Sequence, residues 1–292
     1  EIYPLSLHDA LPIWQFSSPA HVFFTDALPF QPPQFEIDIP LEPDGVITFI
    51  AAGTTIDACH LGVDREAQVV WYTLGTNDCN STLEVLNDEA FFTSKSLGGS
   101  EADWMNETGE ITASLVTPMR THHSAAVLPN NNVLFLVHKN RPYDSERWGE
   151  IVLTGDLIIE VDPVGELVWE WSTFDHVDKE SFPNVEPKTS TKGPEYLDTI
   201  DWTHANSLQV LPETDQILLS LRSQNAVFLI DHITGEVVET FGEQGGFELL
   251  EGEWFEGQHD ATLSMNNELL LFDNGWTKED KPNSRIVRYA ID

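Results

Sequence analysis

Three segments of the chain share one pattern, in which a histidine opens a short apolar run, a polar turn follows, and a second apolar run comes after it. The three histidines are His123, His204 and His259. A pair of strands repeated in this way, with hairpins between the copies, is typical of β-propellers, in which each blade is a four-stranded antiparallel sheet. The repeat constrains the fold strongly, because one unit buries its apolar face only against a neighbouring unit.

The first two copies each continue into a matched hairpin that completes four strands. The two-residue connectors Val164-Gly165 and Thr234-Gly235 lie within these hairpins and favour antiparallel pairing. A weaker copy comes earlier, with residues 59–74 as its hairpin and residues 81–92 as the following pair of strands. The sequence therefore predicts an all-β protein and, more specifically, an incomplete β-propeller of about four blades.

The predicted strands are short runs bounded by Asn, Gly, Pro and Asp, while helical periodicity is weak. This pattern disfavours alternating β-α units and a parallel sheet. The most distinct predicted strands are residues 133–137, 157–161, 167–171, 217–221, 226–230, 236–240 and 269–272.

The first 13 residues, EIYPLSLHDALPI, resemble the in-frame translation of a sequencing-library adapter. They lack the basic start and the long apolar core of a signal peptide. We therefore expect residues 1–13 to be an artefact and residues 14–292 to be one β-propeller domain that is truncated at both ends. The alternative is a genuine N-terminal arm.

The charge of the chain excludes two classes of partner. Acidic residues number 49 against 14 basic ones, which gives a formal net charge of −35 at pH 7. A surface this negative repels phosphate backbones and anionic lipid headgroups, so neither general nucleic-acid binding nor membrane-surface binding is expected. No apolar run reaches the roughly 18 residues of a spanning helix. The two cysteines, Cys59 and Cys79, are compatible with either a disulfide or free thiols.

Longer motifs surround the repeated histidines. They are Thr121-His122-His123, Asp201-Trp-Thr-His-Ala-Asn-Ser207, Ile217-Leu-Leu-Ser-Leu-Arg222, Gln258-His259-Asp260-Ala261 and Leu271-Phe-Asp-Asn-Gly275. Together they resemble the motifs of the bacterial arylsulfotransferases, which use an aryl ester and not a nucleotide sulfate as donor. The resemblance covers about residues 121–292. It implies a six-bladed β-propeller, a periplasmic or extracellular location, and no cofactor.

The resemblance also implies a ping-pong transfer in two steps. A histidine takes the sulfuryl group from a phenolic sulfate ester, the phenol leaves, and the group passes to a phenol acceptor. By motif position, His259 is the sulfuryl acceptor, and His204, Arg222 and His123 are the other catalytic residues. His122 is the less favoured alternative to His123, and Ser124 stands where this family motif often has Asp.

These residue types suit a sulfate monoester, whose sulfur is guarded by three oxygens that share a negative charge. A neutral imidazole is both a competent nucleophile and a tolerable leaving group. The planar guanidinium of Arg222 can hold two sulfate oxygens. A protonated His204 or His123 can neutralise charge or donate a proton to the departing phenoxide.

Other residues carry weaker predictions. His122, Trp202 and Trp276 are candidates for substrate binding, although core packing is the favoured interpretation for the two tryptophans. Asp260 follows the predicted nucleophile, and a turn or an inter-blade hydrogen bond is the favoured interpretation. The remaining histidines, His138 among them, are expected in surface or loop positions.

A metal site is not expected, because no spacing of Cys and His matches a zinc site, and Arg222 would compete for the space beside the histidines. The expected partners are therefore a small aryl sulfate and a phenol. The competing function is a non-catalytic β-propeller that binds a protein partner or a glycan at its mouth.

Overall fold

The computed structural model describes residues 48–51, 58–63, 69–74, 81–87, 90–95, 99–106, 110–183, 188–189, 198–275 and 284–291. The chain divides into two compact units, Glu1–Val116 and Thr117–Asp292. No helix within the described ranges is long and apolar enough to cross a membrane.

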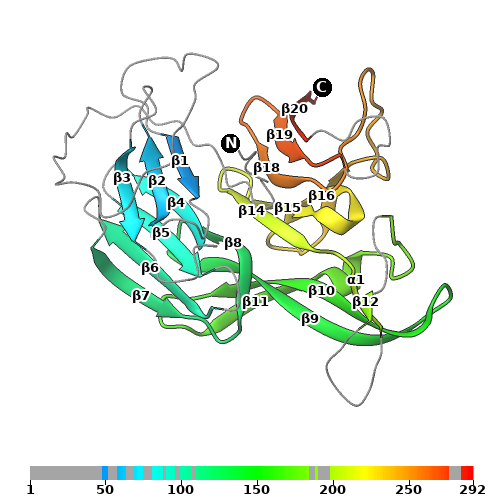
Figure 1. Ribbon diagram of the computed structural model, residues 1–292, viewed down its shortest axis with the longest axis horizontal. Coiled ribbons are helices and arrows are strands. Elements are labelled where there is room, and N and C mark those ends of the chain that lie inside the picture. The colour runs from blue at the N-terminus through cyan, green and yellow to red at the C-terminus, as the bar shows by residue number, and fades with distance from the viewer. Residues whose placement is uncertain are drawn as a thin grey trace, which may run out of the picture. The chain divides into compact units, whose positions relative to one another are not determined.

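The first unit contains two antiparallel sheets, drawn in blue and cyan in Figure 1. The strands of one sheet pair in the order β1–β2–β3, and those of the other in the order β4–β5–β6–β7. In the second sheet, the rings of Phe92 on β5 and Trp104 on β6 lie 5.1 Å apart, edge to face. The strands are β1 (Thr48–Ala51), β2 (Ala58–Val63), β3 (Val69–Leu74), β4 (Ser81–Asn87), β5 (Ala90–Lys95), β6 (Glu101–Asn106) and β7 (Ile111–Val116).

The second unit begins with a sheet whose two central strands are long. Strands β9 (Val133–Ser145) and β10 (Gly149–Val161) pair along 13 residues each, and β8 (Thr121–Val127) pairs with β9. The last part of β10 pairs with β11 (Leu167–Ser172), and its first part pairs in parallel with β13 (Asp198–Asp201). The two-residue strand β12 (Lys188–Thr189) pairs with β13. The hairpin of β9 and β10 therefore extends as a long arm beyond the part of the sheet that resembles a blade.

Two further sheets follow in the second unit. The first pairs in the order β14–β15–β16–β17, and the second in the order β18–β19–β20. All these pairs are antiparallel, and consecutive strands are neighbours, as in propeller blades. The strands are β14 (Ala205–Leu211), β15 (Gln216–Leu221), β16 (Ala226–Asp231), β17 (Val237–Phe241), β18 (His259–Leu263), β19 (Glu268–Asp273) and β20 (Arg285–Ala290).

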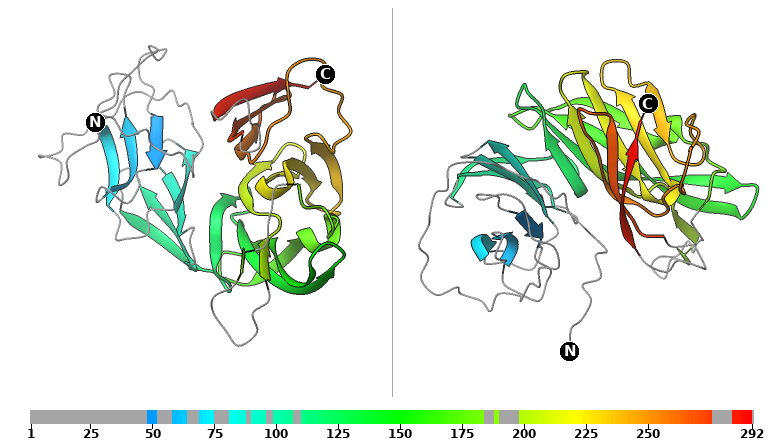
Figure 2. Two further views of the ribbon diagram at one scale, coloured as in Figure 1. Left: turned by 45° about the vertical axis from the view of Figure 1, so that its right-hand side comes forward. Right: turned by 90° about the horizontal axis from the view of Figure 1, so that it is seen from above.

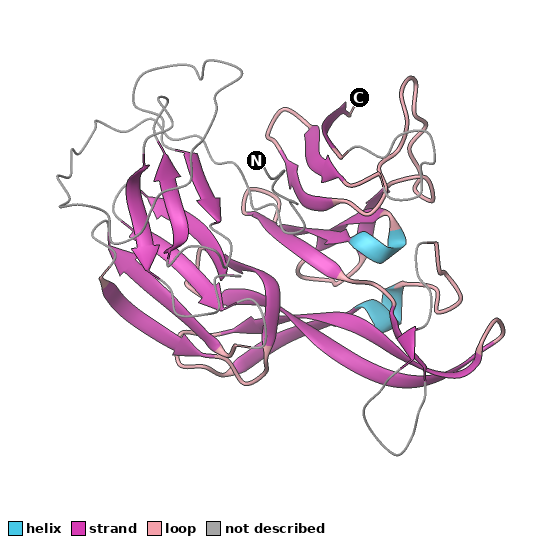
Figure 3. Ribbon diagram, in the orientation of Figure 1, coloured by secondary structure: helices cyan, strands magenta, loops and turns pink. Residues whose placement is uncertain are grey.

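The three sheets of this unit follow one another in space as they do in the chain. Figure 2 shows the yellow sheet β14–β17 between the green sheet around β9 and β10 and the orange-to-red sheet β18–β20. Helical structure among the described residues is limited to α1 (Thr173–His176) and the 3-10 turn η1 (Arg222–Gln224), drawn in cyan in Figure 3.

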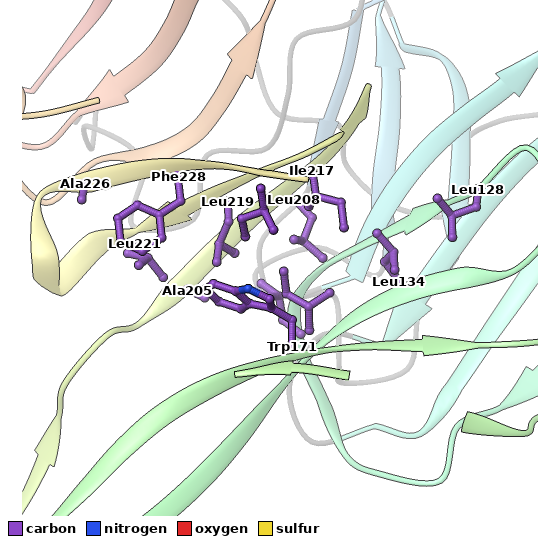
Figure 4. Packing of buried hydrophobic residues seen from close by; sticks show 13 residues of the cluster. Leu128, Leu134, Trp171, Ala205, Leu208, Ile217, Leu219, Leu221, Ala226 and Phe228 are labelled. Carbon is purple, nitrogen blue, oxygen red and sulfur yellow. The ribbon is translucent and has the colours of Figure 1, made fainter. Parts of the chain in front are cut away.

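The core of the second unit lies between these sheets. Leu134, Leu136 and Ile158 of the first sheet belong to one buried apolar cluster with Leu219 and Leu221 of the next. Figure 4 shows Leu134, Leu219 and Leu221 in this cluster. A second apolar cluster joins β14–β17 to β18–β20. Each blade-like sheet therefore buries its apolar faces against its neighbours, as the repeat requires. The second cluster contains Leu218, Val227, Leu229, Phe241, Phe255, Ala261, Leu269 and Leu271.

The all-β, β-propeller prediction is confirmed. The described residues form five sheets, where the sequence indicated about four blade units, because residues 59–74 and 81–92 belong to different sheets. The seven predicted strands all lie on or within one residue of observed strands. The predictions for residues 1–13, Cys79 and Trp276 lie outside the described residues, as does the side chain of Cys59.

Candidate active site

The first strand of each sheet in the second unit carries or follows a residue in the left-handed conformation. The φ angles are 49° at His123, 47° at His204 and 54° at Asp260. Non-glycine residues adopt such angles uncommonly and at an energetic cost, and they are enriched at functional sites, where they aim a side chain. The same backbone conformation at three equivalent places marks this end of the strands as the candidate site.

The register of the strands changes the alignment of the third histidine. In β8, the residue before the left-handed one is His122, which pairs with Leu136. In β18, the corresponding residue is His259, which pairs with Phe272. His259 is therefore equivalent to His122, and Asp260 holds the position of His123 and His204. The sequence repeat aligned His259 with those two histidines, because matching residue types does not reveal a one-residue difference at a bulge.

The structure nevertheless brings the predicted histidines together. The ring centroids of His123 and His204 lie 5.0 Å apart, and those of His204 and His259 lie 6.4 Å apart. His122 joins the group, since its ring centroid lies 5.2 Å from that of His123 and their Nδ1 atoms are 3.0 Å apart. We call His122, His123, His204 and His259 the histidine cluster.

His123 is held in its neutral form. Burial, and then the neighbouring imidazoles of His122, His204 and His259, lower the pKa of His123 to about 2. The sequence left His123 open as a protonated group that neutralises the sulfate charge. The structure corrects this, because His123 is uncharged at neutral pH, and the positive charge of the site has to come from elsewhere.

His204 and Arg222 lie side by side. The backbone N–H of Arg222, the first residue of η1, donates to the carbonyl oxygen of His204 at 3.1 Å. Nδ1 of His204 lies 2.5 Å from Oδ2 of Asp201, the last residue of β13. Burial alone would raise the pKa of Asp201, but the hydrogen bond to His204 and the charges of His204 and Arg222 lower it. The carboxylate thus stays ionised beside two potential cations.

His259 is buried and is anchored on one ring nitrogen. Its Nδ1 lies 3.2 Å from the carbonyl oxygen of Gly257 and 3.0 Å from Nδ2 of Asn274, which donates to the same carbonyl at 2.6 Å. A carbonyl only accepts and an amide nitrogen only donates, so the Gly257 contact calls for a proton on Nδ1 of His259 and the Asn274 contact for a lone pair there. In the tautomer that satisfies the Gly257 contact, Nε2 of His259 carries the lone pair that a nucleophile needs.

A buried carboxylate that the sequence did not single out lies against the cluster. Asp156, on β10, has 1% of its surface exposed. Its Oδ2 accepts hydrogen bonds from Oγ1 of Thr203 at 2.6 Å and from the backbone N–H of Ala205 at 2.7 Å. An acidic residue directly before the apolar run of residues 157–161 is the signal that could have identified it.

Two imidazoles share the other oxygen of Asp156. Nε2 of His122 lies 3.1 Å from Oδ1, outside hydrogen-bond alignment, and Nδ1 of His138 lies 3.2 Å from it. Burial alone would raise the pKa of Asp156, but contacts with His122, His138 and Thr203 lower it well below its usual value. Partial burial opposes protonation of His138, but the hydrogen bond and the charge of Asp156 raise the pKa of His138. His138 is thus at the surface, as expected, and also belongs to this group.

The ligand-type atoms of His122, His138 and Asp156 lie within 4.8 Å of one another. The two rings are stacked, with centroids 3.7 Å apart and planes inclined by 7°. The lone pair of an imidazole nitrogen lies in the ring plane, so two parallel stacked rings cannot both direct a lone pair at one tetrahedral ion. Only one of the two rings, that of His138, is aligned with Oδ1 of Asp156, so these three groups do not have the arrangement of a tetrahedral metal site.

Trp202 lies in the core. It is fully buried, packs with Ile151, Leu153 and Phe174, and donates from Nε1 to the carbonyl oxygen of Ser181 at 3.1 Å. The structure therefore assigns core packing, the interpretation favoured from the sequence, to Trp202 and not a place in a substrate pocket.

Asp260 gives a prediction for the dependence of stability on pH. Burial raises its pKa to about 7, so the folded state resists ionisation of a group that ionises near pH 4 in the unfolded chain. Its stabilising contribution is present below pH 4 and is lost as the pH rises to 7. We expect Asp260→Asn to gain ~2–4 kcal/mol relative to the unsubstituted protein between pH 4 and pH 8, measured by urea unfolding. A difference that stays constant with pH would contradict this.

Comparisons with known proteins identify the family of the chain. The family model described as Arylsulfotransferase (ASST) matches residues 43–292. No curated protein matches the chain. Among solved structures, Kuenenia stuttgartiensis hydrazine synthase is similar at 15% identity and a TM-score of 0.47, over 86% of this chain and 71% of that chain. Myxococcus xanthus glutaminyl cyclase is similar at 13% identity and a TM-score of 0.44, over 84% and 88%. BamB from Moraxella catarrhalis is similar at 10% identity and a TM-score of 0.39, over 84% and 67%.

Proposed function

This chain belongs to the arylsulfotransferase family, and we propose that it moves a sulfuryl group from a phenolic sulfate ester to a phenol acceptor through a sulfohistidine intermediate on His259. The observation that carries the proposal is the histidine cluster beside Arg222, at the positions where the family motifs were recognised. The family supports aryl sulfotransferase activity in general, and the identity of the nucleophile and of the acceptor is the proposed part.

In the first half-reaction, Nε2 of His259 attacks the sulfur of the donor. An N–S bond forms, the bond between sulfur and the aryl oxygen breaks, and the aryl oxygen leaves with the electron pair. The contact of Nδ1 of His259 with the carbonyl oxygen of Gly257 supports this role, because a proton on Nδ1 leaves the lone pair on Nε2. Arg222 binds the sulfuryl oxygens and offsets their shared negative charge.

The departing phenoxide needs a proton, and His204 is the residue suited to supply it. The carboxylate of Asp201 contacts Nδ1 of His204, which leaves Nε2 as the ring nitrogen that can pass a proton to the phenoxide. In the second half-reaction the acceptor phenol gives its proton to His204, its oxygen attacks sulfur, and the N–S bond to His259 breaks. His123, which is neutral, contributes hydrogen bonding and not charge.

The proposal is tested by incubating the protein with p-nitrophenyl sulfate and a phenol, in a chelating buffer without nucleotide. We expect release of p-nitrophenol that depends on the phenol, with the sulfuryl group recovered on the acceptor. Binding of the aryl sulfate without any release would favour the non-catalytic β-propeller instead. A location in the periplasm or outside the cell is part of the same proposal, and protease protection in intact and osmotically shocked cells tests it.

A further inference from the structure

We propose that Asp156 is a positioning residue for the transfer site, holding both left-handed histidines in place through their neighbours. One carboxylate oxygen binds the two residues that flank His204, and the other lies against His122, which precedes His123. The inference rests on the proposed function for its kinetic part, and on the contacts of the histidine cluster for the rest.

The first part of the proposed positioning role concerns His204, through Oδ2 of Asp156. With a φ of 47°, His204 is in a conformation that costs energy and persists only where the surroundings determine it. Oδ2 of Asp156 accepts from Oγ1 of Thr203 and from the backbone N–H of Ala205, the residues directly before and after it. These two hydrogen bonds fix the backbone on both sides of the strained residue and so fix the direction of its side chain.

The second part of the proposed positioning role concerns His122 and His123, through Oδ1 of Asp156. A carboxylate oxygen repels a lone pair at 3.1 Å, so Nε2 of His122 carries the proton and Nδ1 carries the lone pair. Nδ1 of His122 lies 3.0 Å from Nδ1 of His123 and therefore accepts a hydrogen bond from it. The lone pair of His123 is then on Nε2. Asp156 thus sets the tautomers of two rings as well as the backbone at a third.

A neutral amide does not replace this carboxylate. Three hydrogen-bonding groups converge on the carboxylate of Asp156, from His138, Thr203 and Ala205, and Nε2 of His122 lies 3.1 Å from the oxygen that His138 contacts. Asparagine offers one accepting oxygen and one donating nitrogen, so either the His204 side or the His122 side loses its acceptor. Asp156→Asn is therefore a specific disruption with nearly unchanged volume.

The backbone of Asp156 is held independently of its side chain. Its N–H donates to Oγ1 of Thr173 at 3.0 Å, and its carbonyl accepts from the same hydroxyl at 3.1 Å. The strand around it pairs on both sides, with β9 and with β11. We therefore expect the asparagine variant to fold.

Glu160 provides a matched control. It lies four residues along the same strand, on the same face, with 6% of its surface exposed. It also accepts from an imidazole, Nε2 of His232 at 2.8 Å, but its partners are outside the histidine cluster. Glu160→Gln thus removes a buried carboxylate–imidazole contact of the same kind without touching the site.

The test compares the kinetics and the histidine ring signals of the two variants. We expect Asp156→Asn to lower kcat by ~100-fold with KM changed only a few-fold, as for a small misplacement of reacting groups. In ring 15N NMR spectra, the signals of His122 and His123 should move toward mixed tautomers. Glu160→Gln should retain kcat and those signals, whatever its Tm.

The outcomes separate the two proposals. A kcat of Asp156→Asn within twofold of the unsubstituted protein, or an equal loss in Glu160→Gln, would overturn the positioning role. If the unsubstituted protein shows no transfer, the proposed function fails, and the ring signals alone decide the positioning role. If Asp156→Asn does not fold, Thr203→Val removes one donor to Oδ2, and an unchanged kcat in that variant counts against the inference.

Discussion

Replacing His259 with alanine is expected to abolish both half-reactions. Removing the atom that carries the sulfuryl group leaves only binding and charge stabilisation, and loss of an enzyme nucleophile lowers kcat by ~10⁴-fold or more. His259 is buried and anchored on Nδ1, so its Nε2 is the nitrogen that would carry the group. The measurement is mass spectrometry of protein quenched with aryl sulfate present and the phenol absent, which should find the adduct on His259 and no adduct in His259→Ala.

His232→Ala is the control for this experiment. Its ring contacts Glu160, Asp215 and Trp169, so it removes a partly buried imidazole of the same unit without entering the histidine cluster. We expect it to form the adduct at the normal rate. An adduct on His204 or His123, with His259 unmodified, would overturn the assignment of the nucleophile while leaving the reaction class intact.

The sequence was sufficient for the fold because each strand pair is local. Apolar alternation and two-residue turns such as Val164-Gly165 encode hairpins, and the repeat shows that hairpins stack into blades. The long arm of β9 and β10 was not predicted, because residues beyond Val137 are polar and include Pro142. In the first unit, the weak copy was divided between two sheets, since turn signals do not reveal which hairpin joins which sheet.

The candidate site was predictable in its residue types but not in its register. His123, His204 and His259 lie together, yet only the pairing of β8 and β18 shows that His259 corresponds to His122. Asp156 was not predicted because its partners Thr203 and Ala205 are distant in sequence. Nothing in the sequence marks these two residues as donors to a carboxylate. The neutral state of His123 could also not be predicted from the sequence. Burial is the main cause of its lowered pKa, and burial depends on the tertiary structure.

Arg222→Lys is expected to lower kcat/KM by ~100-fold or more, although it keeps the positive charge. The backbone N–H of Arg222 donates to His204, so the substitution leaves the chain in place and changes only the side chain. A lysine ammonium is a point charge and cannot hold two oxygens with one planar group. Removing one preorganised donor to a transition-state oxygen commonly costs 10²–10³-fold in enzymes of other classes.

The acidity of the chain is a second reason to expect a large effect of Arg222→Lys. With 49 acidic residues against 14 basic ones, the average field repels an anionic sulfate ester, so binding depends on cations at the site itself. Arg288→Lys is the matched control, because Arg288 is exposed and pairs only loosely, at 3.5 Å, with Glu268. It should leave kcat/KM for the aryl sulfate unchanged. If Arg222→Lys also stays within a few-fold, a simple positive charge suffices, and two-pronged binding of the sulfuryl oxygens by Arg222 is wrong.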